Sequence, residues 1–525
     1  MNESTYDITI LGSGMGGSLL AIALARQGRK VLVVERYRHP RFIIGEATSP
    51  YGNLALETLA REYDLSEIAN LSTWKGLQEN HPTLIVGLKR GFTFYFHRPD
   101  CRFPAPDLCP PRIRVAASPS DDLSDTNWLR ESVDSYLVQC ARDRGVTVLE
   151  DCPVSCLERR DGMTRLELNP SGSRHVVMSR FLVDATGTGT ILENAGLLPP
   201  SRGALSLPTL TVFGHLDQSR RFDEAHPMGG GNLPYPADDA AVHHLLEEGW
   251  GWSLRFSTGQ TSVGLVLDKR CLPDRGSFGK SVSEAKKLMS QVLDRYPSLR
   301  EHVDSGEWIR GPFVIDELSR TRDTVVGDGW LLLPHAVGFI DPMFSTGMTA
   351  TLLGVLRVAS VLGQTNEPSR ERLQAYENLT RTEQNVMRRF IEGAYASRQN
   401  PRIFRAWSTL YFAAASYGEM AWRLGKRGPW DGMLLSDSTD FMARFSRIEA
   451  ALPAASAPGG DGPFEDLVRR ELEPFNIAGL LEPARGADYP VRIEDLVENS
   501  AKLGYTADQM TRALEGLGLL EQLNP

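Results

Sequence analysis

Residues 8–17 have the sequence ITILGSGMGG, an apolar run that ends in a Gly-x-Gly-x-x-Gly pattern at Gly12, Gly14 and Gly17. An Ala/Leu-rich stretch typical of a helix follows, and the apolar run 31–34 then ends on the acid Glu35. Glycines in this pattern allow a tight turn and let backbone amides approach a pyrophosphate, while the acid accepts hydrogen bonds from a ribose. Because strand, turn, helix and acid occur in this order, the stretch predicts a dinucleotide-binding site.

The composition predicts a large enzyme. The 525 residues, 41% of them hydrophobic, supply enough core for two or three packed units. The 57 basic and 66 acidic residues give a net charge of −9, so we expect neither nucleic acid nor an anionic lipid surface as a partner. We expect a cytoplasmic protein, because no leader sequence and no apolar run long enough to span a membrane is recognised. The cysteines and histidines show no metal-ligand spacing, so we expect reduced thiols and no metal.

The hydrophobic pattern predicts an α/β fold with an interleaved antiparallel layer. We expect residues 1–360 to form a cofactor and substrate module, with the substrate layer at about 76–128 and 200–310. Alternation over residues 87–97 predicts one strand, with phenylalanines on one face and a polar wall that includes Lys89 on the other. His243 and His244 fall in a stretch interpreted as a helix with a solvated face.

The remaining sequence predicts helices. We expect a helical region over residues 361–452, a Pro/Gly/Ala-rich linker over 453–463 and a C-terminal helical cap over 464–525. Aromatic residues of the helical region, among them Tyr411 and Phe412, are interpreted mainly as core, with a roof over the active site as the functional alternative.

Residues 338–347, GFIDPMFSTG, lead into an apolar helix over 348–362. Backbone N–H groups at Ser345, Thr346 and Gly347 would face outward there, with the positive end of the helix dipole behind them. The segment therefore predicts a cradle for an anion, although a simple small-residue helix start is the alternative.

The order of these motifs resembles the FAD enzymes of the p-hydroxybenzoate hydroxylase (GR2-type) fold and, among them, the flavin-dependent halogenases. The family pattern F-x2-P-x2-S-x-G is met at Phe339, Pro342, Ser345 and Gly347. The motifs are closest to those of the halogenases that act on phenols and pyrroles. By this resemblance a set of residues spread over the first 350 positions would bind FAD: Gly12, Gly14, Gly17, Glu35, Arg36, Glu46, Ala47, Arg130, Asp184, Gly338, Thr346, Gly347 and Met348. Halide would bind at Ser345, Thr346 and Gly347.

The resemblance also implies a chemistry. FADH2 from a separate flavin reductase and O2 would form a flavin C4a-hydroperoxide, chloride or bromide would attack it, and hypohalous acid would travel to a lysine beside an electron-rich aromatic substrate. Lys89 begins K-R-G-F-T-F, which is similar to the lysine-bearing strand of phenol halogenases. An ammonium in a dry cavity would hydrogen-bond the hypohalous acid or, with a depressed pKa, form a haloamine. Lys75 is the reserve candidate, and a solvated edge-strand lysine is the alternative interpretation of Lys89.

Two departures from the family pattern concern the substrate side, and a third concerns the cofactor. Phe344 stands where tryptophan halogenases carry a glutamate, which favours a phenol or pyrrole over free tryptophan. The family's W-x-W-x-I-P appears as Trp250-Gly251-Trp252-Ser253-Leu254-Arg255, so the barrier between substrate and flavin is expected to be altered, with Arg255 available to a substrate carboxylate or phosphate. His335 stands in the place of a cofactor-binding aspartate.

These departures keep alternatives open. If the substrate reaches the flavin, the protein would be a monooxygenase that hydroxylates an aromatic small molecule or a protein- or carrier-bound group. A catalytically silent flavoprotein acting as a scaffold is a third hypothesis. The substrate would be free or bound to a carrier protein, and Arg402 and Arg405 are the candidate contacts for an acidic carrier.

Overall fold

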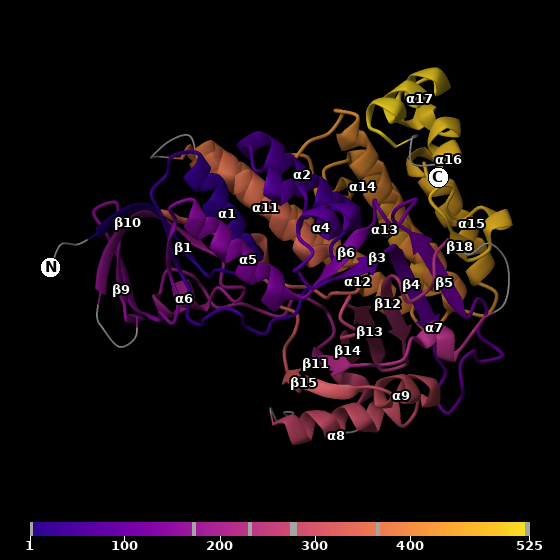
Figure 1. Ribbon diagram of the computed structural model, residues 1–525. Coiled ribbons are helices and arrows are strands. Elements are labelled where there is room, and N and C mark those ends of the chain that lie inside the picture. The colour runs from indigo at the N-terminus through magenta and orange to yellow at the C-terminus, as the bar shows by residue number, and fades with distance from the viewer. Residues whose placement is uncertain (1–3, 171–174, 229–233, 273–280, 364–367, 520–525) are drawn as a thin grey trace.

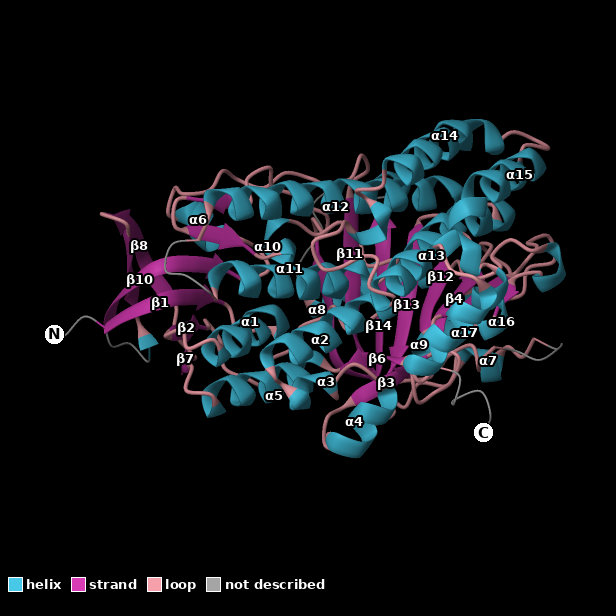
Figure 2. Cartoon of the chain, turned by 90° about the horizontal axis from the view of Figure 1, so that it is seen from above, coloured by secondary structure: helices cyan, strands magenta, loops and turns pink. Residues whose placement is uncertain are grey.

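The computed structural model describes residues 4–170, 175–228, 234–272, 281–363 and 368–519. Within these ranges the strands form two large mixed sheets and one two-stranded sheet. Figure 1 shows the first large sheet at the N-terminal end of the molecule and the second below the C-terminal helices. In the perpendicular view of Figure 2, helices lie between the two sheets.

The first sheet is Rossmann-like. Its central strands run parallel in the order β17-β10-β1-β2-β7, with short antiparallel strands added at β16 and at the β8–β9 hairpin. The strands are β1 (Ser4–Leu11), β2 (Val31–Val34), β7 (Thr147–Leu149), β8 (Val154–Arg160), β9 (Met163–Leu168), β10 (His175–Asp184), β16 (Val326–Gly327) and β17 (Trp330–Leu332). Four successive residues of β2 are buried, as expected for a parallel strand covered on both faces. The chain leaves this sheet twice and returns, first between β2 and β7 and then between β10 and β16.

Two long helices pack on the first sheet, and a third lies against the first of them. Helix α1 (Met15–Arg26) packs against α5 (Arg130–Asp143) and α11 (Thr346–Leu362), and α11 also contacts α2 (Pro50–Tyr63). Both α1 and α11 are buried along most of their length, which explains their apolar sequences. Short helices fill the connections: α3 (Ser66–Ala69), α4 (Trp74–Asn80), α6 (Thr190–Asn194), α7 (Phe222–Ala225) and α10 (Pro334–Val337).

The second sheet is built largely from the two segments expected to form the antiparallel layer, and it extends beyond the predicted boundaries. Its order is β15-β11-β14-β13-β12-β4-β5-β18, mostly antiparallel, with parallel pairs at β12–β4 and β5–β18. The strands are β4 (Gly91–Phe96), β5 (Arg112–Ala116), β11 (Thr209–Asp217), β12 (Ala241–Leu245), β13 (Gly249–Arg255), β14 (Thr261–Asp268), β15 (Glu307–Ile315) and β18 (Asp488–Tyr489). Helices α8 (Val282–Leu293) and α9 (Pro297–Asp304) pack against one face (Figure 1).

Two sequence interpretations of this layer are corrected. The predicted strand 87–97 is broken at Arg90: β3 (Val86–Lys89) pairs with β6 (Asp125–Trp128) in the two-stranded sheet, and β4 begins at Gly91. The predicted polar wall of β4 is buried, because Tyr95 packs on Phe103 and Phe222. His243 and His244 lie on the buried strand β12 and not on a solvated helix, since neighbouring strands flank them on both sides.

The C-terminal region covers the other face of the second sheet. Its helices are α12 (Arg370–Ser397), α13 (Pro401–Arg423), α14 (Thr439–Ala455), α15 (Asp461–Leu472), α16 (Ile493–Glu498) and α17 (Ala507–Gly516). Phe404 and Phe412 of α13 pack edge-on against Phe94 of β4. The predicted linker is shorter than expected, because α14 continues through Pro453 and α15 begins at Asp461. The predicted cap adds strand β18 to the sheet.

Candidate functional site

The three fingerprint glycines have different roles. Gly12 has a φ of +99°, and a Cβ there would lie 2.7 Å from the carbonyl oxygen of Ala185. At Gly17 a Cβ would lie 2.0 Å from the carbonyl oxygen of Gly12, so this glycine lets the helix pack closely on the turn. At Gly14 the nearest atom to a Cβ is a guanidinium nitrogen of Arg41 at 3.5 Å. The protein itself does not require this glycine, which leaves its backbone open to a pyrophosphate.

A long groove of about 970 Å³ begins at this turn. It follows residues 34–45, crosses Arg130 and residues 185–188, and reaches the start of α11. Seven of the predicted cofactor residues line it: Gly12, Gly14, Glu35, Arg36, Arg130, Gly347 and Met348. The length of the groove and its start at the glycine turn fit an extended dinucleotide.

Glu35 and Arg130 form the polar walls of the groove. The Glu35 carboxylate accepts hydrogen bonds from the amide and hydroxyl of Ser13, at 3.0 and 3.1 Å, and from the Tyr37 amide. Burial alone would raise the pKa of Glu35, but Arg41 and these hydrogen bonds lower it, so the group is a carboxylate at neutral pH. Arg130 donates to both oxygens of Asp134 and to the carbonyl of Gly45, which fixes its guanidinium at the groove.

Asp184 does not itself line the groove, but it directly precedes Ala185 and Thr186, which do. Its Oδ1 accepts hydrogen bonds from the amide and hydroxyl of Thr186, at 2.9 and 2.7 Å. Its Oδ2 is buried and has no partner. An unsatisfied buried oxygen is costly, and a hydroxyl of a bound cofactor would satisfy it. Burial also raises the pKa of Asp184.

Helix α11 begins with an uncapped N-terminus. Ser345 has a φ of +53° and its side chain caps no backbone amide, so the first amides of the helix, from Thr346 on, lack a side-chain partner. A Cβ on Gly347 would meet only Phe339, at 3.5 Å. The start of this buried helix therefore leaves room and hydrogen-bond donors for an anion or for an electron-rich cofactor edge.

Several predicted cofactor residues lie near the groove without lining it. The Glu46 carboxylate accepts a hydrogen bond from His215 at 2.9 Å, and Ala47 forms a backbone bridge to Asn127. Gly338 and Thr346 line a small neighbouring cavity of about 20 Å³.

His335 lies on the groove, but both ring nitrogens already have protein partners. They face the carbonyl oxygen of Ala185 at 3.1 Å and the hydroxyl of Thr351 at 3.2 Å. Burial lowers the pKa of His335 to about 4, so the ring is neutral.

Arg320 is a groove residue that sequence reasoning missed. It donates to the carbonyl oxygens of Gly187 and His335, and its Nε is buried without a partner. Burial lowers its pKa to about 10, so it remains a cation. No motif marks it, because the preceding segment is irregular and only the fold brings it to the groove.

Lys89 is fully buried, which excludes the interpretation as a solvated edge-strand lysine. Its Nζ lies 3.4 Å from Oδ2 of Asp125 and 4.3 Å from the centre of the Phe92 ring. It therefore meets the phenylalanine face of β4 and not the polar wall to which the sequence assigned it. Lys75, the reserve candidate, is 55% exposed and pairs with Asp122 at the surface.

Asp125 was also missed by sequence reasoning. It stands opposite Lys89 in the β3–β6 pair and accepts a 2.9 Å hydrogen bond from the Asn53 amide. Burial raises the pKa of Asp125 to about 6, opposed by Lys89. Burial lowers the pKa of Lys89, while Asp125 acts to raise it. Asp125 sits in a polar stretch that resembles a loop, so only the strand register reveals the pair.

An apolar cavity of about 150 Å³ lies beside Phe92. Its walls are β4 and β5, helix α13 with Tyr411 and Phe412, and residues 477–496 of the C-terminal cap. Phe344 lies next to this wall, because its ring stacks on Tyr411 at 4.6 Å. The cap thus roofs the cavity, and two of the aromatic residues on α13 contribute to it.

The two indoles are placed as core residues of β13. Trp250 stacks on His243 at 5.1 Å, and Trp252 donates to the Ser262 hydroxyl at 3.1 Å. Arg255 donates to the carbonyl oxygen of Ser219 and lines neither the groove nor the apolar cavity. The structure therefore does not bring Arg255 together with the other site residues.

Arg402 and Arg405 both pair with Glu465, and Arg402 also pairs with Asp461. These arginines tie α13 to α15 and give no support to a carrier-docking surface there. Over the part of the chain that the structure describes, no group of three histidine, cysteine or acidic side chains is placed to hold a metal ion. Across the same residues, no helix combines the length and apolarity that a bilayer span requires.

Comparison with known proteins identifies the family. A profile described as Tryptophan halogenase matches residues 129–410, and one described as FAD dependent oxidoreductase matches residues 7–199. The chain is 30% identical over 357 residues to tetracycline 7-halogenase of Kitasatospora aureofaciens, a match that covers 66% of this chain and 62% of that protein. It is 25% identical to monodechloroaminopyrrolnitrin halogenase PrnC of Pseudomonas fluorescens, over 95% of this chain and 90% of the relative.

Solved structures agree on the fold. The chain superposes on the crystal structure of halogenase PltM with a TM-score of 0.80 at 21% identity, over 91% of this chain and 98% of PltM. A structure of PltM with phloroglucinol and FAD gives a TM-score of 0.78 at 22% identity, covering 92% and 98%. The α/β architecture, the glycine turn and the matched profile lead to one conclusion: the chain belongs to the tryptophan halogenase family and is an FAD-dependent oxidoreductase.

Proposed function

We propose that the protein halogenates a small, electron-rich aromatic substrate, using FADH2, O2 and chloride or bromide. The observation that carries the proposal is the separation of the groove from the apolar cavity. The FAD-sized groove and the apolar cavity share no lining residue among those described, and buried Lys89 contacts the Phe92 ring that lines the cavity. A substrate held in the cavity stays away from the flavin, so the oxidised halogen has to travel to it.

Bound reduced flavin would supply, with O2, the oxidising power that converts a halide ion to hypohalous acid. The protein's own groups would bind the cofactor, the halide and the hypohalous acid. Glu35 and Arg130 of the groove lining, with Asp184 behind it, would hold the polar parts of the cofactor, and the amides at the start of α11 would hold an anion. Lys89 receives the hypohalous acid.

In this proposal Lys89 is protonated, and its ammonium group donates a hydrogen bond. Asp125, at 3.4 Å from Nζ, favours the charged form of the lysine, and Asn53 holds Asp125 in place. A hydrogen bond from the ammonium to the oxygen of hypohalous acid makes the halogen more electrophilic and holds it beside the ring. Phe344 offers no base, and the one carboxylate among the described residues of the cavity lining is that of Glu419, so we expect the ring to be activated mainly by its own substituents.

The cavity limits the substrate. Its volume of about 150 Å³ is below the roughly 300–1,000 Å³ of drug-sized sites, and its walls are mainly apolar. We therefore expect a neutral phenol, pyrrole or arylamine of one or two rings. Some relatives act on larger or tethered substrates, among them a brominase of a carrier-bound pyrrole from Pseudoalteromonas luteoviolacea, 24% identical over 69% of this chain and 78% of that protein.

The test is product analysis with purified protein, FAD, a flavin reductase, NADH, oxygen, bromide and a panel of small phenols, pyrroles and arylamines. The expected product carries the paired mass peaks of bromine. A gain of one oxygen that does not depend on bromide would instead identify direct hydroxylation, which is the monooxygenase alternative.

A further inference from the structure

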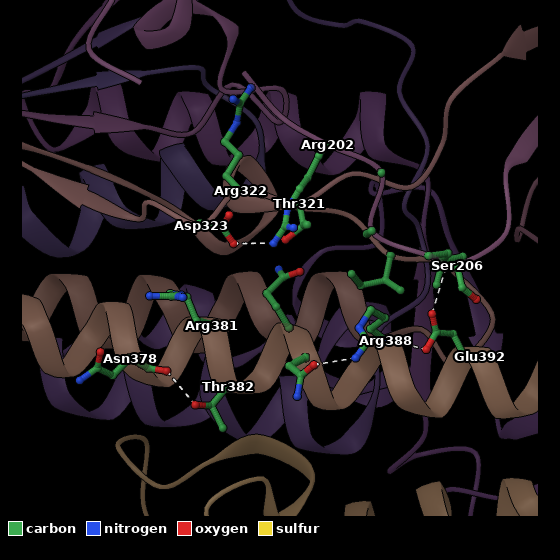
Figure 3. Close-up of a pocket in the computed structure, with 16 residues that line it drawn as sticks. Arg202, Ser206, Thr321, Arg322, Asp323, Asn378, Arg381, Thr382, Arg388 and Glu392 are labelled. Carbon is green, nitrogen blue, oxygen red and sulfur yellow. Dashed lines mark hydrogen bonds and ion pairs between the residues drawn. The ribbon is translucent and has the colours of Figure 1, made fainter. Parts of the chain in front are cut away.

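A basin rich in arginines opens beside helix α12. It measures about 720 Å³ and is lined by residues 202–206 and 321–323 and by one side of α12. Figure 3 shows Arg381 and Arg388 on α12, facing the segment that carries Arg202, Arg322 and Asp323. The proposed function assigns no role to this basin.

The charges of the basin are unbalanced. Arg202 pairs with Asp323 at 2.7 Å and Arg388 with Glu392 at 2.5 Å, and these are the two acids of the lining. Arg322 is 4% exposed and pairs with Glu193, which lies outside the lining. Arg381 has no ion-pair or hydrogen-bond partner among the described residues. Because Arg202, Arg322 and Arg388 each have an acidic partner, the excess positive charge of the basin is that of Arg381, and it raises the local concentration of small anions.

The basin adjoins the cradle at the start of α11. Ile340 and Gln384 line both the basin and the small cavity of about 20 Å³ that Thr346 and Gly347 bound from the other direction. That volume exceeds the roughly 10–15 Å³ needed for one water, so the cavity holds at least one water-sized species. Gln384 is 7% exposed, and its Oε1 is buried without a partner. This amide oxygen is a hydrogen-bond acceptor, so its lack of a partner indicates that a water molecule or another donor is accommodated at the junction.

We propose that this basin is the access route of the halide: anions gather at Arg381, pass between Ile340 and Gln384, and reach the amides at the start of α11. The inference rests on the proposed function, since it assumes a halide-using enzyme. The path meets the FAD groove only at its end, where His335, Phe339 and Gly347 line both the small cavity and the groove, and it shares no described lining residue with the apolar cavity, so a bound substrate does not block it.

The test compares Arg381→Glu with Arg512→Glu, a matched charge reversal on the exposed face of α17. For Arg381→Glu we expect the KM for bromide to rise about three- to tenfold at low ionic strength, with kcat at saturating bromide retained. The difference is expected to shrink in 0.5 M potassium sulfate, because salt screens the field. Arg512→Glu is expected to match the unaltered protein.

A second readout does not require turnover. Bromide binding to the protein loaded with oxidised FAD is followed by the line width of the bromide NMR signal, and Arg381→Glu is expected to reduce the broadening while Arg512→Glu is not. If the unaltered protein brominates a substrate and Arg381→Glu changes neither KM nor line width, the access route is wrong and the function stands. If no substrate is brominated but Arg381 governs bromide binding, the proposed function fails and the anion basin stands. If bromide neither binds nor reacts, both are wrong.

Discussion

Lys89 and Asp125 face each other across the two-stranded sheet of β3 and β6, with 3.4 Å between Nζ and Oδ2 and with both side chains buried. A buried ion pair contributes little net stability, because the cost of removing both charges from water offsets their attraction. Such a pair beside an apolar cavity is better explained by chemistry. We therefore assign the pair a role in the proposed reaction.

Replacing Lys89 with Met should abolish halogenation and leave flavin chemistry intact. The side chain keeps its length and loses its charge, so hypohalous acid forms and finds no ammonium. We expect product formation to fall about a hundredfold or more, while reduced flavin is still consumed at the unaltered rate. Product by mass spectrometry and flavin oxidation by absorbance at the flavin band measure the two quantities.

The control addresses folding, since Lys89→Met leaves Asp125 buried without its partner. The double variant with Lys89→Met and Asp125→Asn removes both charges and should unfold at a higher temperature than the single variant, yet form no more product. Lys75→Met removes a surface lysine and should behave like the unaltered protein. Substantial product from the double variant would exclude the lysine relay.

Asp125→Asn should shift the pH dependence of kcat for halogenation. The carboxylate favours the charged form of Lys89, so its loss lowers the pKa of a lysine that burial already lowers. If halogenation needs the ammonium, the alkaline limb of the kcat profile moves to lower pH in this variant. An acid limb that moves instead would mean that the neutral amine reacts, and a profile that does not move would remove Asp125 from the mechanism.

Asp184→Asn should weaken FAD binding. The amide keeps an acceptor for Thr186 but replaces the unpartnered Oδ2 with a donor, which cannot accept from a cofactor hydroxyl. We expect the Kd for FAD to rise about tenfold, the loss of one buried hydrogen bond to a charged group. Fluorescence titration measures it. Asp328→Asn, at an aspartate with an 89% exposed side chain, is the control, and an equal rise there would contradict the assignment.

Asp341 should make stability fall as the pH rises. Burial raises the pKa of this carboxyl from 3.8 to about 7, so between these values the folded protein holds a proton that the unfolded chain releases. The contribution of Asp341 to the free energy of unfolding is therefore present at low pH and is lost as the pH passes 7. Urea unfolding at pH 5 and pH 8 should show a smaller decline in Asp341→Asn than in the unaltered protein. Equal declines of the free energy of unfolding in the two proteins would contradict a raised pKa for Asp341.

Ala415→Phe should close the apolar cavity. Ala415 lines it from α13, and a phenyl ring would fill most of its volume. We expect the KM for the aromatic substrate to rise about tenfold or more, because the substrate ring loses its apolar contact with the cavity walls. The Kd for FAD should not change. A KM that stays constant would place the substrate elsewhere.

The cofactor half of the fold was predictable because its signals are local. The turn at residues 11–17, the acid Glu35 and the segment 339–347 each combine a motif with its neighbouring strand or helix, and the structure brings Gly12, Glu35 and Gly347 to one groove. Contiguous patterns of this kind can be recognised in a sequence without knowledge of tertiary contacts.

The errors have a common cause, which is that strand pairing over long separations is invisible in one sequence. The buried histidines of β12 were misassigned because the strand is covered on both sides, so the alternation of exposed and buried residues is absent. Asp125 and Arg320 carry no motif, and only register and fold bring them to their sites. The cap could not be linked to the second sheet, because β18 lies more than 370 residues after β5 in the chain.

The most direct test is a bromide assay of the unaltered protein and Lys89→Met, run side by side with FAD, a reductase, NADH and oxygen on small phenols, pyrroles and arylamines. The account predicts a product with the bromine isotope pair for the unaltered protein and none for Lys89→Met, at equal consumption of reduced flavin. Equal bromination by both proteins, or an oxygenated product that does not depend on bromide, would contradict it.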